Sequence, residues 1–249
     1  MTQAASTFRF KRGDHVCIFY HDEEALLQTL VPYLAEGLNN RERCFCAQRK
    51  EFIPVLLKRL QSRGTDVASA LREKALEIHT VEDLYFPRGK FEPKPLMGLL
   101  EAAIENAVKE GFSGFRTAGE LSWAASGICD CDQLVGYEEM VEACFPGKPV
   151  IGTCQYKMSE FAPEVLERVL GSHRLALTQT MARSNHSALQ VRYGKYYADI
   201  VADRLNPEST FYYVIQQAGD KDVLSWGATQ SLMTAMSESE QAVLHLRSV

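Results

Sequence analysis

The sequence has no uninterrupted apolar run as long as the roughly 18 residues that a membrane-spanning helix needs. Its first twelve residues also lack the apolar core of a secretory signal peptide. Basic residues are outnumbered, 27 against 32 acidic ones, and they form no run long enough to follow a nucleic-acid backbone. We therefore expect a cytoplasmic protein that contacts neither membranes nor nucleic acid directly.

Cysteines are few and odd in number, which argues against a disulfide framework. Seven of them are spread through 249 residues with a strong apolar pattern. We expect Cys17, Cys44, Cys46 and Cys154 to be small buried apolar side chains. No cysteine pair has the two-residue gap of a structural zinc site, and no histidine pair has helical ligand spacing. Spacing along the chain thus predicts no metal site and leaves open only one assembled from distant segments.

Phosphate-binding loops and hydrolase motifs are missing as well. A phosphate loop needs glycines followed by lysine and serine or threonine, and no segment fits that pattern. After the first predicted strand the chain instead places Asp22, Glu23 and Glu24 at a helix start, where they would repel a triphosphate. Neither Gly-x-Ser-x-Gly nor His-Glu-x-x-His occurs. The sequence therefore predicts no catalytic residue, and it identifies no cofactor.

What the sequence does contain is a regular alternation of short β-branched or aromatic runs with amphipathic stretches, the pattern of βαβ units. Helices such as Glu23–Asn39 and Leu96–Lys109 carry one apolar stripe each. Six strands are predicted between the helices, at Val16–Tyr20, Arg43–Ala47, Leu76–Thr80, Gly114–Ala118, Val150–Tyr156 and Ala176–Thr180. We expect an α/β three-layer sandwich with a mainly parallel sheet, which ligands approach at the carboxyl ends of its strands.

The character of the sequence changes after Thr180. We expect residues 7–180 to form the main domain and residues 181–249 to form a small C-terminal appendage. In the appendage we predict one long helix at Arg183–Leu205, a strand at Thr210–Gln216 and a helical tail from about Ser231. So short a segment cannot enclose a large core of its own, and it should pack on the main domain or on a second subunit.

Two segments of the main domain are candidate binding elements. The connection Val81–Pro95 is long and rich in turn formers, which is typical of a lid, and Phe86 and Phe91 would cover the ligand. A plain surface loop packed on the core is the alternative. Further along, the segment RTAGELSW closes a strand and presents Glu120 and Trp123 together. There the alternative is that Glu120 caps a helix and Trp123 belongs to the core.

Three motifs in order resemble a known family. They read Gly13-Asp14-His15-Val16-Cys17-Ile18-Phe19-Tyr20, then Gly119-Glu120-Leu121-Ser122-Trp123, then Cys154-Gln155-Tyr156. They are similar to the MEDS domain, a sensory module named for methanogens, methylotrophs and DcmR, and the resemblance covers residues 7–180. It implies a RecA/KaiC-like fold with a degenerate phosphate loop that senses small molecules such as hydrocarbon derivatives. Members are commonly joined to histidine kinase, anti-sigma or DNA-binding modules.

These features predict a non-catalytic domain that transmits ligand binding to a signalling partner. Because the chain shows no kinase or helix-turn-helix signature, that partner would be a separate histidine kinase or transcription regulator. One alternative is an enzyme with residual nucleotide-hydrolase or transferase activity that uses Glu120 as a base. Another is a ligand-free homodimeric scaffold that associates through the helix predicted at Arg183–Leu205. The expected ligand-binding residues are Tyr20, His21, Glu120, Trp123, Gln155 and Tyr156, with Phe86 and Phe91 in the lid.

Overall fold

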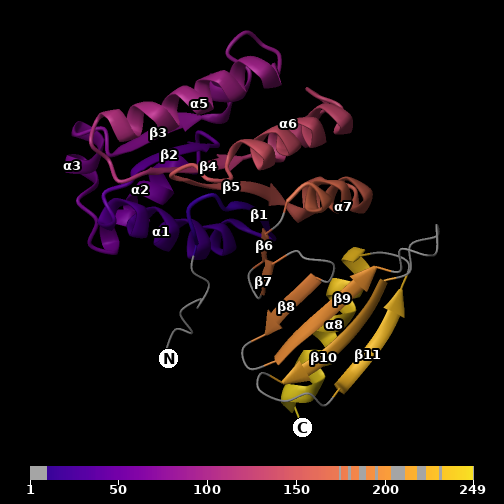
Figure 1. Cartoon of the computed structure of the whole chain (residues 1–249). Helices are drawn as coiled ribbons and strands as arrows, with labels where there is room; N and C mark the ends of the chain where they lie inside the picture. The colour runs from indigo at the N-terminus through magenta and orange to yellow at the C-terminus, as the bar shows by residue number, and fades with distance from the viewer. Residues whose placement is uncertain are drawn as a thin grey trace.

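A computed structural model of the chain describes residues 10–173, 175–178, 181–184, 189–193, 196–202, 211–217, 223–229 and 232–248. Its main domain is built on a seven-stranded sheet with the order β3-β2-β4-β5-β1-β6-β7 (Figure 1). Every neighbouring pair of strands is parallel except β6 and β7. The strands are β1 His15–Tyr20, β2 Arg43–Gln48, β3 Leu76–Thr80, β4 Phe115–Glu120, β5 Val150–Lys157, β6 Leu175–Thr178 and β7 Met181–Ser184.

Helices cover both faces of this sheet and bury its strands (Figure 1). One face, here called the α1 face, carries α1 (Glu23–Asn39), α2 (Ile53–Ser62) and α3 (Val67–Arg72). The opposite α6 face carries α4 (Val81–Tyr85), α5 (Pro93–Lys109), α6 (Cys131–Cys144) and α7 (Pro163–Gly171). The predicted α/β fold with a mainly parallel sheet is confirmed. Each of the six predicted strands matches an observed strand to within two residues at either end.

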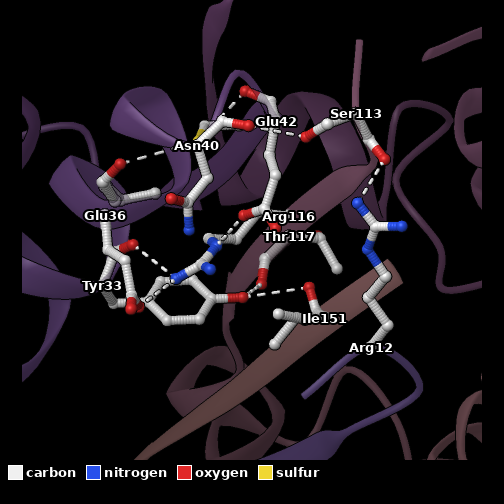
Figure 2. A network of polar contacts seen from close by, with 11 residues as sticks. Arg12, Tyr33, Glu36, Asn40, Glu42, Ser113, Arg116, Thr117 and Ile151 are labelled. Atoms are coloured by element: carbon white, nitrogen blue, oxygen red, sulfur yellow. Dashed lines mark hydrogen bonds and ion pairs between the residues drawn. The ribbon is translucent and has the colours of Figure 1, made fainter. Parts of the chain in front are cut away.

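A buried arginine fastens the amino end of β4 to α1 (Figure 2). The Arg116 guanidinium pairs with the carboxylates of Glu42 and Glu36, and its Nη1 donates to the Tyr33 carbonyl at 2.8 Å. It also lies 4.7 Å from the centre of the Tyr33 ring. The glycine at position 37 makes room for it, because a Cβ there would lie 2.6 Å from Arg116 Cδ. A charge that is 1 % exposed is thus matched by two carboxylates and an aromatic face.

Part of the segment between β3 and α5 is helical, so its loop is shorter than the sequence indicates. Thr80 accepts a hydrogen bond from the Asp83 amide at 3.1 Å and so begins the one-turn helix α4. At the other end, Pro93 and Pro95 occupy the first turn of α5 instead of the loop. The prediction of one continuous loop over Val81–Pro95 is therefore wrong, and only residues 86–92 connect the two helices.

The C-terminal part is a second, antiparallel sheet, β11-β10-β9-β8, with the helix α8 packed on it (Figure 1). The long helix predicted over Arg183–Leu205 is wrong, because the described residues of this range lie in strands. Its aromatic and β-branched residues also fit a strand, and pairing with β10 decides between the two readings. The predicted strand and tail are confirmed as β10 and α8. The elements are β8 Leu189–Tyr193, β9 Tyr196–Ala202, β10 Phe211–Gln217, β11 Val223–Thr229 and α8 Leu232–Ser248.

None of the helices in the described ranges is both long and apolar enough to cross a lipid bilayer.

Candidate functional site

The sheet divides seven of the eight predicted ligand residues between its two faces. Side chains alternate along a strand, so Gln155 points to the α1 face while its neighbour Tyr156 points to the α6 face. His21 is exposed in the turn before α1. Two groups result: the α1 face holds Tyr20, Glu120 and Gln155, and the α6 face holds Tyr156, Phe86, Phe91 and Trp123.

On the α1 face, Glu120 ends β4 as a fully buried carboxylate. Its Oε1 accepts from the Tyr20 hydroxyl at 2.9 Å and from the Ser122 amide at 3.0 Å. Its Oε2 is buried and has no hydrogen-bond partner among the described residues. Burial raises the pKa of Glu120 above its ordinary value, although hydrogen bonds from Ser122 and Tyr20 and the charge of Arg49 oppose that rise.

Two further residues complete this group and were not predicted from the sequence. Gln48 ends β2 and donates from Nε2 to Gln155 Oε1 at 2.6 Å. Gln48 Oε1 and Arg49 Nε are buried, and neither has a hydrogen-bond partner in the part of the chain that the structure describes. The signal that points to them is polar residues directly after a predicted strand, at the edge where the other candidates gather.

The start of α1, directly after β1, disfavours phosphate binding. The Asp22 carboxylate accepts from the Ala25 amide at 2.8 Å and so occupies the place where a phosphate loop would present free amides. The two glutamates that follow are balanced, since Glu23 pairs with Arg49 at 3.1 Å and Glu24 binds Arg59 through both oxygens. Glu23 and Glu24 thus repel an anion less than the sequence indicates. The cap at Asp22 is the stronger obstacle to phosphate at this helix end.

On the α6 face, five ring side chains pack together; we call them the aromatic cluster, and they are Tyr85, Phe86, Phe91, Trp123 and Tyr137. The Trp123 ring centre lies 5.1 Å from that of Tyr85, 5.3 Å from that of Phe86 and 4.9 Å from that of Phe91. Tyr137 closes the group, 5.5 Å from Phe91. The Trp123 indole nitrogen is buried and donates to no described residue. A buried N–H group without an acceptor destabilises the folded state until an acceptor reaches it.

A groove of about 440 Å³ runs outside this cluster, between α5 and α6. Phe91 and Tyr137 belong to both the aromatic cluster and the groove, so the rings form the inner wall of the groove. The remaining lining comes from the start of α5 and one side of α6: Glu92, Pro93, Lys94, Pro95, Gln133, Gly136 and Met140.

Deeper on the α6 face lies a second group that sequence spacing did not reveal; we call it the buried cluster, and it consists of His15, Glu138, Cys154 and His173. His15 Nε2 lies 3.2 Å from both Glu138 Oε2 and Cys154 Sγ. His173 Nε2 lies 3.3 Å from the same carboxylate oxygen. The four residues come from β1, α6, β5 and the end of α7, so no local motif contains them.

Electrostatics inside the buried cluster favour a charged carboxylate. Burial alone would raise the pKa of Glu138, but the nearby imidazoles of His173 and His15 hold it well below its ordinary value. Burial would likewise lower the pKa of His15, yet Glu138 and Glu142 raise it instead. The Cys154 thiol has a pKa well above its ordinary value because it is buried beside Glu138. The cluster thus offers imidazole, carboxylate and thiol donors in one apolar surrounding.

Comparison with known proteins places the chain in a family. Residues 14–174 match the model of the family described as MEDS, the methanogen/methylotroph, DcmR sensory domain. The transcriptional repressor DcmR of Methylorubrum extorquens is 27 % identical over 161 residues, which are 64 % of this chain and 58 % of that protein. The chain thus spans somewhat more than half the length of this curated relative.

Two solved structures are also similar to the chain. The flagellar accessory protein FlaH from Methanocaldococcus jannaschii has a TM-score of 0.46 at 13 % identity and covers 83 % of this chain and 79 % of its own. A KaiC-like protein from Pyrococcus horikoshii OT3 has a TM-score of 0.44 at 12 % identity, with 88 % and 85 % covered. The family match includes β1, the strand end at Glu120 and the whole buried cluster. The chain belongs to the MEDS family of sensory domains.

Proposed function

We propose that this chain binds a small, largely apolar molecule in the groove between α5 and α6 and reports its presence to a regulatory partner, without transforming it chemically. The observation that carries the proposal is the aromatic cluster behind the groove. Its rings offer a large, rigid apolar wall, which is the usual lining of a small-molecule site. The buried Trp123 indole adds one hydrogen-bond donor that the described residues leave unused.

The chemistry of this wall defines the class of ligand. An apolar body would replace water against Phe91, Tyr137 and Met140, and one acceptor atom would receive the indole hydrogen of Trp123. Halogenated, carbonyl or hydroxyl derivatives of small hydrocarbons have this combination. Reaching the indole requires Phe91 to move, because it packs on Trp123 and also lines the groove. That motion gives residues 86–92 the role of a lid.

The same motion offers a route to an output surface. Tyr137 lies on α6, and α6 contacts α7, which in turn contacts α8 of the C-terminal sheet. A ligand that favours one position of α6 therefore biases the surface that a partner meets. A transcription regulator or histidine kinase is the partner we propose, since the curated relative is a transcriptional repressor. Seven free cysteines agree with a reducing, cytoplasmic compartment.

Tryptophan fluorescence tests the proposal directly. The chain has two tryptophans, so Trp226→Phe leaves Trp123 as the single reporter. Titration with chloroform, 1-butanol and benzene is expected to shift its emission in a saturable way, more strongly for the two probes that carry polar atoms. Met140→Phe narrows the groove without adding a second tryptophan and is expected to weaken binding at least about tenfold, the effect of losing roughly 1.4 kcal/mol of contact.

The matched control substitutes Met97, a buried methionine of α5 outside the lining of the groove. Met97→Leu conserves volume and should leave the titration unchanged. Emission that changes linearly with probe concentration in all variants would show solvent effects alone, and the proposal would then be abandoned.

The α1 face supports a second candidate, an acid–base role for Glu120. A buried carboxyl group with a raised pKa and one free oxygen, beside Arg49, is a common feature of catalytic sites. Hydrolysis of ATP with Mg²⁺ that disappears in Glu120→Gln would favour an enzyme. Glu120 is 0 % exposed, so a substrate would first have to open this face, and we rank this function second.

A further inference from the structure

The buried cluster brings four metal-binding side chains to one point from four elements of the fold. His15, Glu138 and His173 are at most 1 % exposed, and Cys154 is 7 % exposed. One donor atom from each lies within 4.8 Å of all the others. Ionisable groups are rarely buried so closely together unless they bind each other fully or bind an ion.

Hydrogen bonds among these side chains do not satisfy them. His15 Nε2 carries at most one hydrogen, yet it lies 3.2 Å from both Glu138 Oε2 and Cys154 Sγ. Glu138 Oε2 and His173 Nε2 approach to 3.3 Å without forming an aligned hydrogen bond, and both atoms are buried without such a partner. A positive ion between these atoms would satisfy all of them at once.

The distances fit a tetrahedral ion. Zn²⁺ binds nitrogen, oxygen and sulfur at about 2.0–2.3 Å, which separates neighbouring ligands by about 3.3–3.8 Å. The contacts of 3.2, 3.2 and 3.3 Å lie within about 0.1 Å of the lower end of that range, and the other pairs of donor atoms lie within 4.8 Å of each other. We propose that His15 Nε2, Glu138 Oε2, Cys154 Sγ and His173 Nε2 form a binding site for one divalent transition-metal ion, with Zn²⁺ as the best match to this donor set.

The surrounding residues orient the ligands as metal sites require. His15 Nδ1 lies 3.1 Å from Glu142 Oε2, and His173 Nδ1 lies 2.8 Å from the Val169 carbonyl, so each imidazole presents Nε2 to the centre. The Tyr156 hydroxyl donates to Glu138 Oε1, which leaves Oε2 for the ion. Such outer partners fix the tautomer of a ligating histidine and the direction of its lone pair.

Ion binding would join the sensor to its C-terminal part. Cys154 must lose its thiol proton to solvent when it binds the ion. The ion then connects β1 and β5 to α6, which carries Tyr137 of the groove, and to His173 at the end of α7, just before β6. This inference goes beyond the proposed sensory function, because the site lies outside the groove and does not need its ligand.

Cobalt substitution of the full chain tests the site. After removal of bound metal with a chelator, one equivalent of Co²⁺ is expected to give a near-ultraviolet thiolate-to-cobalt band and the visible bands of a tetrahedral ion. One equivalent of Zn²⁺ should abolish both. Zn²⁺ in about a thousandfold excess over Kd is expected to raise Tm by about 8 °C or more.

Variants assign the ligands. Cys154→Ser should remove the thiolate band, whereas Cys46→Ser, a buried cysteine on the α1 face, should keep it. Glu142→Gln alters an outer partner of His15 and should weaken Co²⁺ binding about 10–100-fold with an unchanged spectrum. If Cys154→Ser fails to fold, the spectrum of the unaltered chain still decides. Absence of stoichiometric binding, or a thiolate band that survives in a folded Cys154→Ser chain, would overturn the site.

Discussion

Glu120 and Glu138 are both fully buried, yet their surroundings move their pKa values in opposite directions. The neutral hydroxyl of Tyr20 and one amide cannot offset the loss of water around Glu120. Two imidazoles more than offset it around Glu138. A charged glutamate is therefore unfavourable at position 120, on the α1 face, and favourable at position 138, on the α6 face.

At the residue scale, Glu120→Gln should stabilise the protein at neutral pH. The folded state keeps a proton on Glu120 that the unfolded chain releases near its ordinary value of 4.5. The contribution of Glu120 to stability therefore falls as pH rises from about 4.5 towards the raised pKa of the folded state. Glutamine carries no ionisable proton, so the variant does not lose stability in this way. Urea unfolding at pH 5, 6 and 7 should show a gain in the free energy of unfolding that grows with pH.

Glu105→Gln serves as the control and should give no such gain, because that side chain is 70 % exposed and pairs with Lys109 on the surface of α5. A gain in the Glu120 variant that is the same at all three pH values would contradict a raised pKa and would point to packing instead.

Arg116 allows a second prediction at this scale. Arg116→Met keeps the volume but leaves Glu42, itself 6 % exposed, without its cation. Breaking a buried pair from one side costs about 3–5 kcal/mol. Arg72→Met removes an exposed arginine, 70 % accessible, whose pair with Glu73 is worth at most about 1 kcal/mol. Equal losses in the two variants, measured by urea unfolding, would refute the structural role of the Arg116 network.

At the element scale, β4 and α4 depend on a glycine. A Cβ at position 119 would lie 2.1 Å from the Tyr85 hydroxyl, so Gly119→Ala must displace Tyr85 from the aromatic cluster. We expect a loss of about 1–3 kcal/mol and a red-shifted Trp123 emission in the Trp226→Phe background.

Gly98 on α5 provides the matched control, because a Cβ added there would meet no atom within 4 Å beyond its chain neighbours and its own helix backbone. Gly98→Ala should stabilise the chain by about 0.5–1 kcal/mol through helix propensity alone. If both alanines leave Trp123 emission unchanged, Tyr85 does not depend on the glycine at 119.

At the scale of the whole molecule, one apolar core continues from the main domain into the C-terminal part. Val169 and Leu170 of α7 belong to the same buried group as Ala235, Met236 and Val243 of α8. The two sheets should therefore unfold together. Thermal unfolding is followed by Trp123 emission in Trp226→Phe and by Trp226 emission in Trp123→Phe. In each variant the midpoint of the fluorescence transition is expected to equal the Tm that circular dichroism gives for the same variant.

Two separate transitions would indicate that the C-terminal sheet folds independently, and the proposed route from α6 through α7 to α8 would lose its support. Val243→Ala offers a further check, because it leaves a cavity at this contact. The free energy of unfolding measured with either tryptophan should fall by the same amount, about 1–3 kcal/mol.

The sequence by itself determined the elements of the main domain. Apolar runs and stripes are local signals, so the parallel strands and α1 follow from the spacing of residues such as Leu27, Leu30 and Leu34. The absence of a phosphate loop and the three family motifs are likewise properties of the chain alone. The same local reasoning failed at Arg183–Leu205, where strand pairing outweighed a helical spacing of apolar residues.

Only the tertiary structure decided which side chains meet. Strand alternation placed Tyr20 and Glu120 on the α1 face, and the 3₁₀ turn Ser122–Ser126 after β4 brings Trp123 to the α6 face, although all three lie at or just after strand ends. His15 and His173 are 158 residues apart in the sequence, and their ring centres lie 4.1 Å apart only because β1 and the end of α7 pack on α6. Contacts between segments so distant depend on packing, which no local spacing encodes.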